Sequence, residues 1–312
     1  MILSIGLLIV GLVLLTKGAD IFIEGASSLA TKFKIPQIII GLTIVAMGTS
    51  APEASVSINS ALKGINGVAI GNILGSNIAN VLFILGVTAM VYPLLMKKET
   101  VKFEIPFTVF ITTLLCGLGY YFHSITREAA LVLLFFFMLY LVYLFKMTKK
   151  QDTNSANDEI QPQLSNLFKM ILFIILGLGA LVYGSDLTVN AAFNIARMLN
   201  ISERVIGLTI VAIGTSLPEL VTCEVAALKQ QCDLAIGNII GSSIFNVLFV
   251  LGITGVIQPM NFDTVFLFDG IIAILAVVFL FLFTIRDKYL CRKQGFILVA
   301  FYIGYLAYLI IK

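Results

Sequence analysis

Charged residues are scarce in this chain of 312 residues: Asp, Glu, Lys and Arg together make up 12%, while hydrophobic residues make up 59%. An average soluble domain has about 25% charged residues and roughly 45–50% apolar ones. A chain with so little polar surface cannot cover a globule in water, so its solvent must be lipid. The composition argues against a secreted enzyme or a disordered scaffold. The net charge of +3 is too small to indicate a nucleic acid or another polyanionic partner.

The chain is also poor in the residues that build metal centres and nucleophilic sites. It has one histidine, His123, and four cysteines that show no CxxC spacing. We expect the cysteines to be small packed residues rather than metal ligands or disulfide partners. No constellation of His, Cys or Ser and Lys falls in the apolar core. The sequence therefore predicts that the protein is not an enzyme and carries no prosthetic group.

Apolar runs long enough to cross a bilayer fill most of the sequence. A membrane-spanning helix needs about 20 predominantly apolar residues, and short polar breaks divide this chain into ten such runs. They cover 2–16 (extending as far as 33), 36–62, 67–93, 103–122, 128–147, 166–183 (extending as far as 198), 202–229, 233–258, 264–285 and 295–311. We predict an all-α integral membrane protein with ten transmembrane helices.

One break differs from the others. Residues 149–165 are rich in Asn, Ser, Gln and acids and contain almost nothing that packs. This composition is typical of a solvated linker. We expect it to separate a first five-helix half, 1–148, from a second, 166–312.

The two halves repeat each other. A shift of 166 places GLTIVAMGTSAPE at 41–53 on GLTIVAIGTSLPE at 207–219, and GNILGSNIAN at 71–80 on GNIIGSSIFN at 237–246. Over 41–93 against 207–259, 30 of 53 positions are identical. Apolar composition alone can produce matches of Leu and Ile, but not aligned Pro, Glu, Asn and Gly. The chain is an internal duplication.

The basic residues predict the orientation. Of the 20 Lys and Arg residues, 13 lie in breaks that follow odd-numbered spans and five in breaks that follow even-numbered ones. Positive charge favours the cytoplasmic side, so we expect both termini outside and the linker at 149–165 in the cytoplasm. Five spans in each half is an odd number, so the second half must be inverted relative to the first. Inverted-topology repeats are typical of secondary transporters.

Two glutamates stand in the middle of apolar runs. Glu53 and Glu219 are repeat mates, and each directly follows a proline. An unpaired carboxylate at that depth is costly and is by default a functional residue. Proline has no N–H, so Pro52 and Pro218 break the helix and free the carbonyls four residues earlier. Irregular backbone in the membrane is tolerated where it lines a cavity.

Further oxygen atoms gather near each glutamate. Thr49 and Ser50 precede Glu53, and Thr215 and Ser216 precede Glu219. In the span that follows, polar residues recur every four positions and so share one helix face; they are Asn72, Ser76 and Asn80 in the first half and Asn238, Ser242 and Asn246 in the second. Oxygen ligands suit hard cations such as Ca²⁺ and Na⁺.

The motifs GTSxPE and GNxxGSxIxN, present in both halves, resemble the alpha repeats of the cation/calcium exchanger superfamily, which includes the prokaryotic sodium/calcium exchangers. The resemblance implies a central Ca²⁺ site made by Glu53, Glu219 and the backbone carbonyls of Thr49 and Thr215. It also implies flanking Na⁺ sites that draw on Ser50, Ser76, Ser216 and Ser242. Asn80 and Asn246 fall where family members carry Asn or Asp facing the centre.

These residues predict an antiporter that exchanges Ca²⁺ for Na⁺ by alternating access in a prokaryotic inner membrane, with no protein partner. Two carboxylates carry a charge of −2, which one Ca²⁺ or two Na⁺ neutralise, and a third Na⁺ makes the exchange electrogenic. Because both ions need the same glutamates, they compete for one site. Two alternatives stay open: a cation/proton exchanger that uses the same glutamates, and a cation channel or non-transporting sensor.

Overall fold

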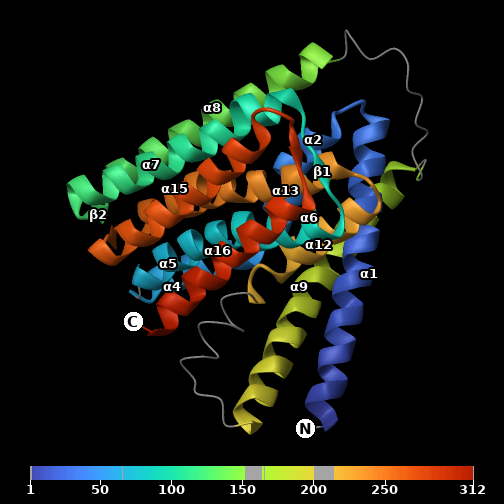
Figure 1. The fold of residues 1–312 in the computed structure, drawn as a ribbon, viewed down its shortest axis with the longest axis horizontal. Helices are drawn as coiled ribbons and strands as arrows, with labels where there is room; N and C mark the ends of the chain where they lie inside the picture. Colours follow the sequence, from blue (N-terminus) through green and yellow to red (C-terminus); the bar gives the residue numbers. More distant parts are fainter. Residues whose placement is uncertain (1, 65, 152–163, 165, 200–213, 312) are drawn as a thin grey trace.

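The computed structural model describes residues 2–64, 66–151, 164, 166–199 and 214–311. Helices form nearly all of this part of the chain (Figure 1). Six long helices each correspond to one predicted span; they are α1 (Ile2–Lys32), α7 (Ile105–Phe122), α8 (Arg127–Gln151), α9 (Leu167–Met198), α15 (Thr264–Thr284) and α16 (Arg292–Ile311). The longer limits predicted for the first and sixth spans are confirmed by α1 and α9.

The spans that carry the repeated motifs are interrupted instead of continuous. The second span consists of α2 (Gln37–Ile40), the π-helical turn η1 (Gly41–Val45), α3 (Ala46–Thr49) and α4 (Ala51–Leu62). The third consists of α5 (Asn66–Ile78), η2 (Ala79–Ile84) and α6 (Leu85–Val91), and the eighth of α13 (Cys232–Phe245), η5 (Asn246–Val250) and α14 (Leu251–Ile257). Turns of π-helix are rare and are frequently found at functional sites.

Within the described residues, eight helices are long and apolar enough to cross a membrane, and the bent pair 37–62 makes a ninth candidate. The predicted seventh span, 202–229, lies partly outside the described residues, and its second part is α12 (Leu217–Leu228). Ten spans therefore remain a prediction. Most of the predicted linker also lies outside the described residues, and α8 continues as far as Gln151.

The helices divide into an inner and an outer group. Nearly every residue of α13 is buried, including polar Asn238 and Ser242. By contrast, α8 presents large apolar side chains on its outer surface, such as Leu131, Phe135 and Met138. An apolar surface around a polar interior is the arrangement expected in lipid.

Helices α1 and α9 lie side by side and cross the direction of α7 and α8 (Figure 1). Glycines make this contact possible: a Cβ on Gly18 would lie 3.0 Å from the carbonyl oxygen of Gly177, and one on Gly11 3.0 Å from that of Gly184. The two contacts are repeat mates of each other. Small residues let membrane helices approach this closely.

Two very short β pairs, which the sequence did not predict, join the halves. β1 (Leu94–Leu95) pairs antiparallel with β4 (Tyr289–Leu290), and β2 (Ser124–Ile125) with β3 (Met260–Asn261). β1 and β2 lie at opposite ends of the helix bundle (Figure 1). Two-residue strands between apolar runs leave too little pattern for a sequence-based prediction.

Candidate functional site

The helix breaks expected at the two prolines are present in both halves. Ser50 (φ −81°, ψ 9°) separates α3 from α4, and the chain bends by 48° there. Ser216 (φ −91°, ψ 10°) precedes α12 in the same way. Pro52 and Pro218 then occupy the first turn of the new helix, where a missing N–H does no harm and the fixed φ favours helix.

Each break places its glutamate in the first turn of a helix. Glu53 lies in the first turn of α4 and Glu219 in that of α12, and both side chains are 0% exposed. The first turn has free N–H groups and the positive end of the helix dipole, which favour a negative charge. The carbonyl of Gly214, which Pro218 was expected to free, accepts a hydrogen bond from Ser185 of α9 (2.8 Å).

The two halves exchange hydrogen bonds at the glutamates. Ser50 Oγ donates to Glu219 Oε1 (2.9 Å), and Ser216 Oγ donates to Glu53 Oε1 (3.2 Å). Each serine thus binds the glutamate of the other half. This reciprocal pair brings the two breaks together in the interior, where each carboxylate has one oxygen held in place.

In each half, an asparagine of the span that follows the break hydrogen-bonds to the backbone of the broken helix. Asn72 Nδ2 donates to the backbone carbonyl of Glu53 (3.2 Å), and Asn238 Nδ2 to that of Glu219 (3.4 Å). Asn238 Oδ1 also accepts from Thr49 Oγ1 (2.9 Å), which again joins the two halves. Both asparagines hold the glutamate backbone and so orient the carboxylates.

Four buried oxygen atoms of the motif residues accept no hydrogen bond from the described part of the chain. They are Glu53 Oε2, Glu219 Oε2, Asn80 Oδ1 and Asn246 Oδ1, one carboxylate and one amide oxygen from each half. Neither glutamate forms a salt bridge with a residue that the structure describes. Buried charges must be neutralised and buried acceptors satisfied. A cation with oxygen ligands fits both requirements.

The other predicted site residues lie on the same elements. Thr49 is buried, and Ser242 Oγ donates to the carbonyl of Ala46 (3.4 Å). Ser76 is buried one turn before Asn80 on the helix formed by α5 and η2. Thr215 is half-buried beside Ser216.

Sequence reasoning missed Asn77. Its Nδ2 donates to the carbonyl of Ser243 (3.1 Å), and its Oδ1 accepts from Asn246 Nδ2 (3.3 Å). These bonds cross from α5 to the pair formed by α13 and η5. The repeat hides this residue because its mate is Ser243 rather than a second asparagine.

A second buried carboxylate was also missed. Glu104 closes the π-helical turn η3 (Thr100–Glu104) and is 0% exposed. Tyr143 Oη donates to its Oε1 (3.0 Å), while no described residue contacts its Oε2 through a hydrogen bond. Asp269 of α15 has a similar contact in the second half, where Tyr305 Oη donates to its Oδ1 (2.9 Å). Glu104 lies between α7 and α8, away from the two helix breaks.

The fold and the paired, carboxylate-containing breaks define a multi-pass membrane transporter for cations rather than an enzyme. The sequence model of the sodium/calcium exchanger protein family matches residues 3–146 and again 169–311, one match in each half. The chain therefore belongs to the sodium/calcium exchanger family.

Individual relatives agree over nearly full length. CaxA of Alkalimonas amylolytica is 41% identical over 95% of each chain, and the inner membrane protein YrbG of Escherichia coli is 34% identical over 99% of this chain and 97% of its own. The sodium/calcium exchanger MaX1 of Methanosarcina acetivorans is 32% identical over 97% of each. A solved structure of the sodium-calcium exchanger NCX_Mj is 30% identical over 98% of each chain, with a TM-score of 0.85.

Proposed function

We propose that this protein is a secondary-active antiporter that exchanges Ca²⁺ for Na⁺ by alternating access. The four oxygens of Glu53, Glu219, Asn80 and Asn246 that lack a donor carry this proposal, because they are buried, come equally from the two halves and include two carboxylates. Hard cations select such oxygen ligands. The names of MaX1 and NCX_Mj support the choice of Na⁺ and Ca²⁺.

The carboxylates explain why two ions compete. In our proposal Ca²⁺ binds Glu53, Glu219 and the backbone carbonyls of Thr49 and Thr215. Na⁺ binds beside them through the hydroxyl and amide oxygens of the same breaks and the following spans; these belong to Ser50, Ser76, Asn80, Ser216, Ser242 and Asn246. An empty site would bury two repelling carboxylates, which opposes crossing without an ion. Exchange then follows from one charged site with two alternative cargoes.

We further propose ten spans in two inverted halves, 1–148 and 166–312, joined by a cytoplasmic linker at 149–165. The strand pairs support the inversion. β1 follows span three and pairs with β4, which follows span nine. The repeat mate of β1 is β3, which follows span eight, and that of β4 is β2, which follows span four. These two mates also pair with each other. Two paired strands must lie on the same side of the membrane. Because span four separates β1 from β2, the two strand pairs lie on opposite sides, and each strand therefore lies on the side opposite its repeat mate. The name of YrbG supports an inner-membrane location.

Flux into proteoliposomes tests the proposal. Vesicles loaded with Na⁺ and diluted into Na⁺-free buffer should take up radioactive Ca²⁺, and vesicles loaded with K⁺ or choline should not. Uptake driven by an imposed proton gradient, and indifferent to Na⁺, would overturn the exchange of Ca²⁺ for Na⁺.

That second outcome would establish the runner-up, a cation/proton exchanger. Its support is that the described residues supply no side-chain cation to Glu53 or Glu219, so protons are the other means of neutralising them. A channel would instead show Ca²⁺ conductance with no counter-ion requirement.

A further inference from the structure

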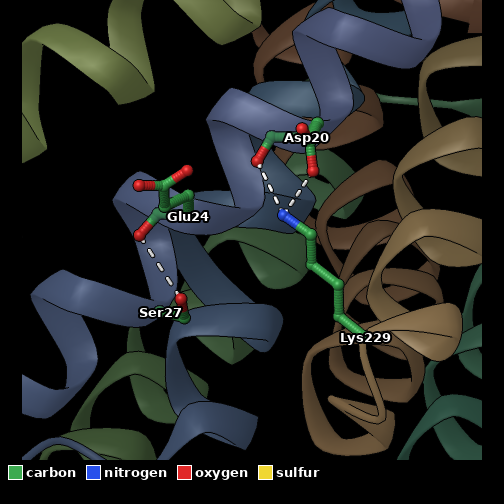
Figure 2. Close-up of polar contacts among 4 residues, drawn as sticks. All are labelled: Asp20, Glu24, Ser27 and Lys229. Carbon is green, nitrogen blue, oxygen red and sulfur yellow. Dashed lines mark hydrogen bonds and ion pairs between the residues drawn. The ribbon is translucent and has the colours of Figure 1, made fainter. Parts of the chain in front are cut away.

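Helix α1 is tied to α12 by a charged contact outside the ion site (Figure 2). Lys229, which caps the C-terminus of α12, contacts Asp20 of α1 twice: Nζ lies 2.5 Å from Asp20 Oδ1 and donates to the Asp20 carbonyl (3.2 Å). The side chains remain 32% and 46% exposed, beside a crevice of about 310 Å³. Exposed ion pairs are weak, so this contact is readily reversible.

The contact has a complete set of repeat mates. The shift of 166 that aligns the halves places Asp20 on Asp186 of α9, and Lys63, which caps α4, on Lys229. Lys63 and Asp186 are exposed, and among the described residues they form no salt bridge. The chain thus contains two equivalent aspartate and lysine pairs, of which one is closed in this structure.

Other charges near the closed pair are not duplicated. In Figure 2 the carboxylate of Glu24 points away from Lys229, and its backbone carbonyl accepts from Ser27 Oγ (3.3 Å). The repeat mate of Glu24 is Asn190. The duplication therefore singles out Asp20, Lys229 and their mates.

The glycine crossing links the two pairs mechanically. Gly11 and Gly18 of α1 meet Gly184 and Gly177 of α9 backbone to backbone. Helices in such close contact move together, so a displacement that carries Asp20 away from α12 also moves Asp186 relative to α4.

We propose that the pairs Asp20–Lys229 and Asp186–Lys63 are alternative latches, of which one closes as the other opens. The four residues are positioning residues: they hold α1 and α9 against the ion-binding helices on one side at a time. In the proposed orientation, Lys229 lies at the cytoplasmic end of α12, so this structure is latched on the cytoplasmic side. This inference rests on the proposed alternating access of the two halves.

Crosslinking in membranes tests the exchange of latches. In a background in which the four native cysteines are replaced, cysteines are introduced as Asp20→Cys with Lys229→Cys, and as Asp186→Cys with Lys63→Cys. A short bis-methanethiosulfonate is used, which joins two cysteines through disulfides that a reductant cleaves, because a lysine side chain holds the backbones farther apart than a disulfide spans. Each pair should crosslink and block transport until the reagent is cleaved.

The decisive variant carries all four cysteines. Each molecule should then contain one crosslink or the other, and changing Na⁺ and Ca²⁺ should shift the ratio. The ion pair Lys97–Asp233 (2.6 Å), converted by Lys97→Cys with Asp233→Cys, is the matched control and should crosslink whatever the ions. Molecules that carry both crosslinks, or a second pair that never forms, would overturn the latch.

Charge removal gives a second readout. Asp20→Asn should increase crosslinking of the pair at 63 and 186 by up to about fivefold, the size of effect that an exposed ion pair supports. Glu24→Gln should leave it unchanged, and equal effects of the two variants would contradict the proposal. Crosslinking does not require Ca²⁺ as cargo. If the two crosslinks alternate but Na⁺/Ca²⁺ exchange is absent, the proposed function is wrong and the latch is retained.

Discussion

Glu53 and Glu219 each have one oxygen bound to a serine of the opposite half and one that has no partner in the ranges that the structure describes. Glutamine in either position keeps the oxygen that accepts from serine and loses the charge. We expect Glu53→Gln and Glu219→Gln each to lower Na⁺-driven Ca²⁺ uptake by more than about a hundredfold, since even outer partners of metal ligands matter by 10–100-fold. Flux in proteoliposomes measures this.

Folding must be intact for that result to count. Size-exclusion profiles of both variants should match the parent, because removing a buried charge does not remove packing. Glu128→Gln, at an exposed glutamate in the first turn of α8, is the matched control and should transport normally. Normal exchange by either Glu53→Gln or Glu219→Gln would refute the site assignment.

Glu104 is a buried carboxylate to which we assign no transport role. Its contact with Tyr143 (3.0 Å) uses one oxygen, and the other is unsatisfied. Glu104→Gln retains the acceptor for Tyr143 and removes an ionisable group whose burial is unfavourable. We expect transport within about twofold and a thermal midpoint equal to or above the parent's. A thermal melt and a flux assay test both, and loss of flux would place Glu104 in the transport machinery.

At this scale the sequence predicted two buried glutamates beside helix breaks, but not the hydrogen-bond partners of their carboxylates. Prolines and the repeat identify Glu53 and Glu219 without a structure. The bond from Ser50 to Glu219 joins residues 169 positions apart, and spacing within one half cannot reveal how the halves face each other. The contacts of Asn77 also cross between halves, and they were hidden for this reason as well as by the mismatch of Asn77 with Ser243 in the repeat.

Among the elements, the contact between α1 and α9 depends on missing side chains. A Cβ on Gly177 would lie 2.6 Å from Phe22 N and 2.8 Å from the Gly18 carbonyl oxygen. Both are backbone atoms, which cannot move without moving α1. Gly177→Ala should destabilise the protein by about 1–3 kcal/mol, as overpacking does. Exchange should slow as well if the two helices move as one unit.

The same helix supplies the control. A Cβ on Gly179 would meet nothing within 4 Å, so Gly179→Ala should be neutral or stabilise by up to about 1 kcal/mol through helix propensity. Thermal midpoints in detergent separate the two variants. If both alanines shifted the midpoint equally, close packing would not be the reason for the glycines.

Element boundaries show where sequence patterns stop being informative. The break at Ser50 was expected because Pro52 cannot donate to the preceding turn. The π-helical turns at Ala79–Ile84 and Asn246–Val250 were not, because a single wider turn leaves the apolar pattern almost unchanged. Their occurrence at repeat-mate positions, each containing a motif asparagine, links them to the site.

For the whole molecule, the predicted orientation in the membrane can be tested by a simple labelling experiment. The distribution of basic residues places the linker in the cytoplasm. Ser155→Cys, in the background without native cysteines, should react with a membrane-impermeant thiol reagent only in inside-out vesicles. Labelling in intact cells would reverse the orientation and with it the side on which Asp20 and Lys229 are latched.

The sequence predicts more of the overall architecture than of its details. Composition, hydrophobic runs and the shift of 166 were enough to predict the membrane class, the duplication and the long first and sixth helices. The strand pairs β1–β4 and β2–β3 could not be predicted, because they depend on how loops from different halves meet after the helices pack. They nevertheless have the two-fold relation that the duplication requires.

The charge of the loaded site determines whether membrane potential drives transport. Two carboxylates balance one Ca²⁺, so three Na⁺ leave one positive charge that moves with Na⁺. Ca²⁺ entering a Na⁺-loaded vesicle then expels net positive charge, and an inside-positive potential should promote uptake. At about 2.3 kcal/mol per charge per 100 mV, 100 mV should raise the equilibrium Ca²⁺ gradient by roughly fiftyfold. Imposing the potential with valinomycin and a K⁺ gradient tests this, with vesicles lacking internal Na⁺ as the control for K⁺ itself. Indifference to potential would mean two Na⁺ for each Ca²⁺, with the two glutamates neutralised by either cargo.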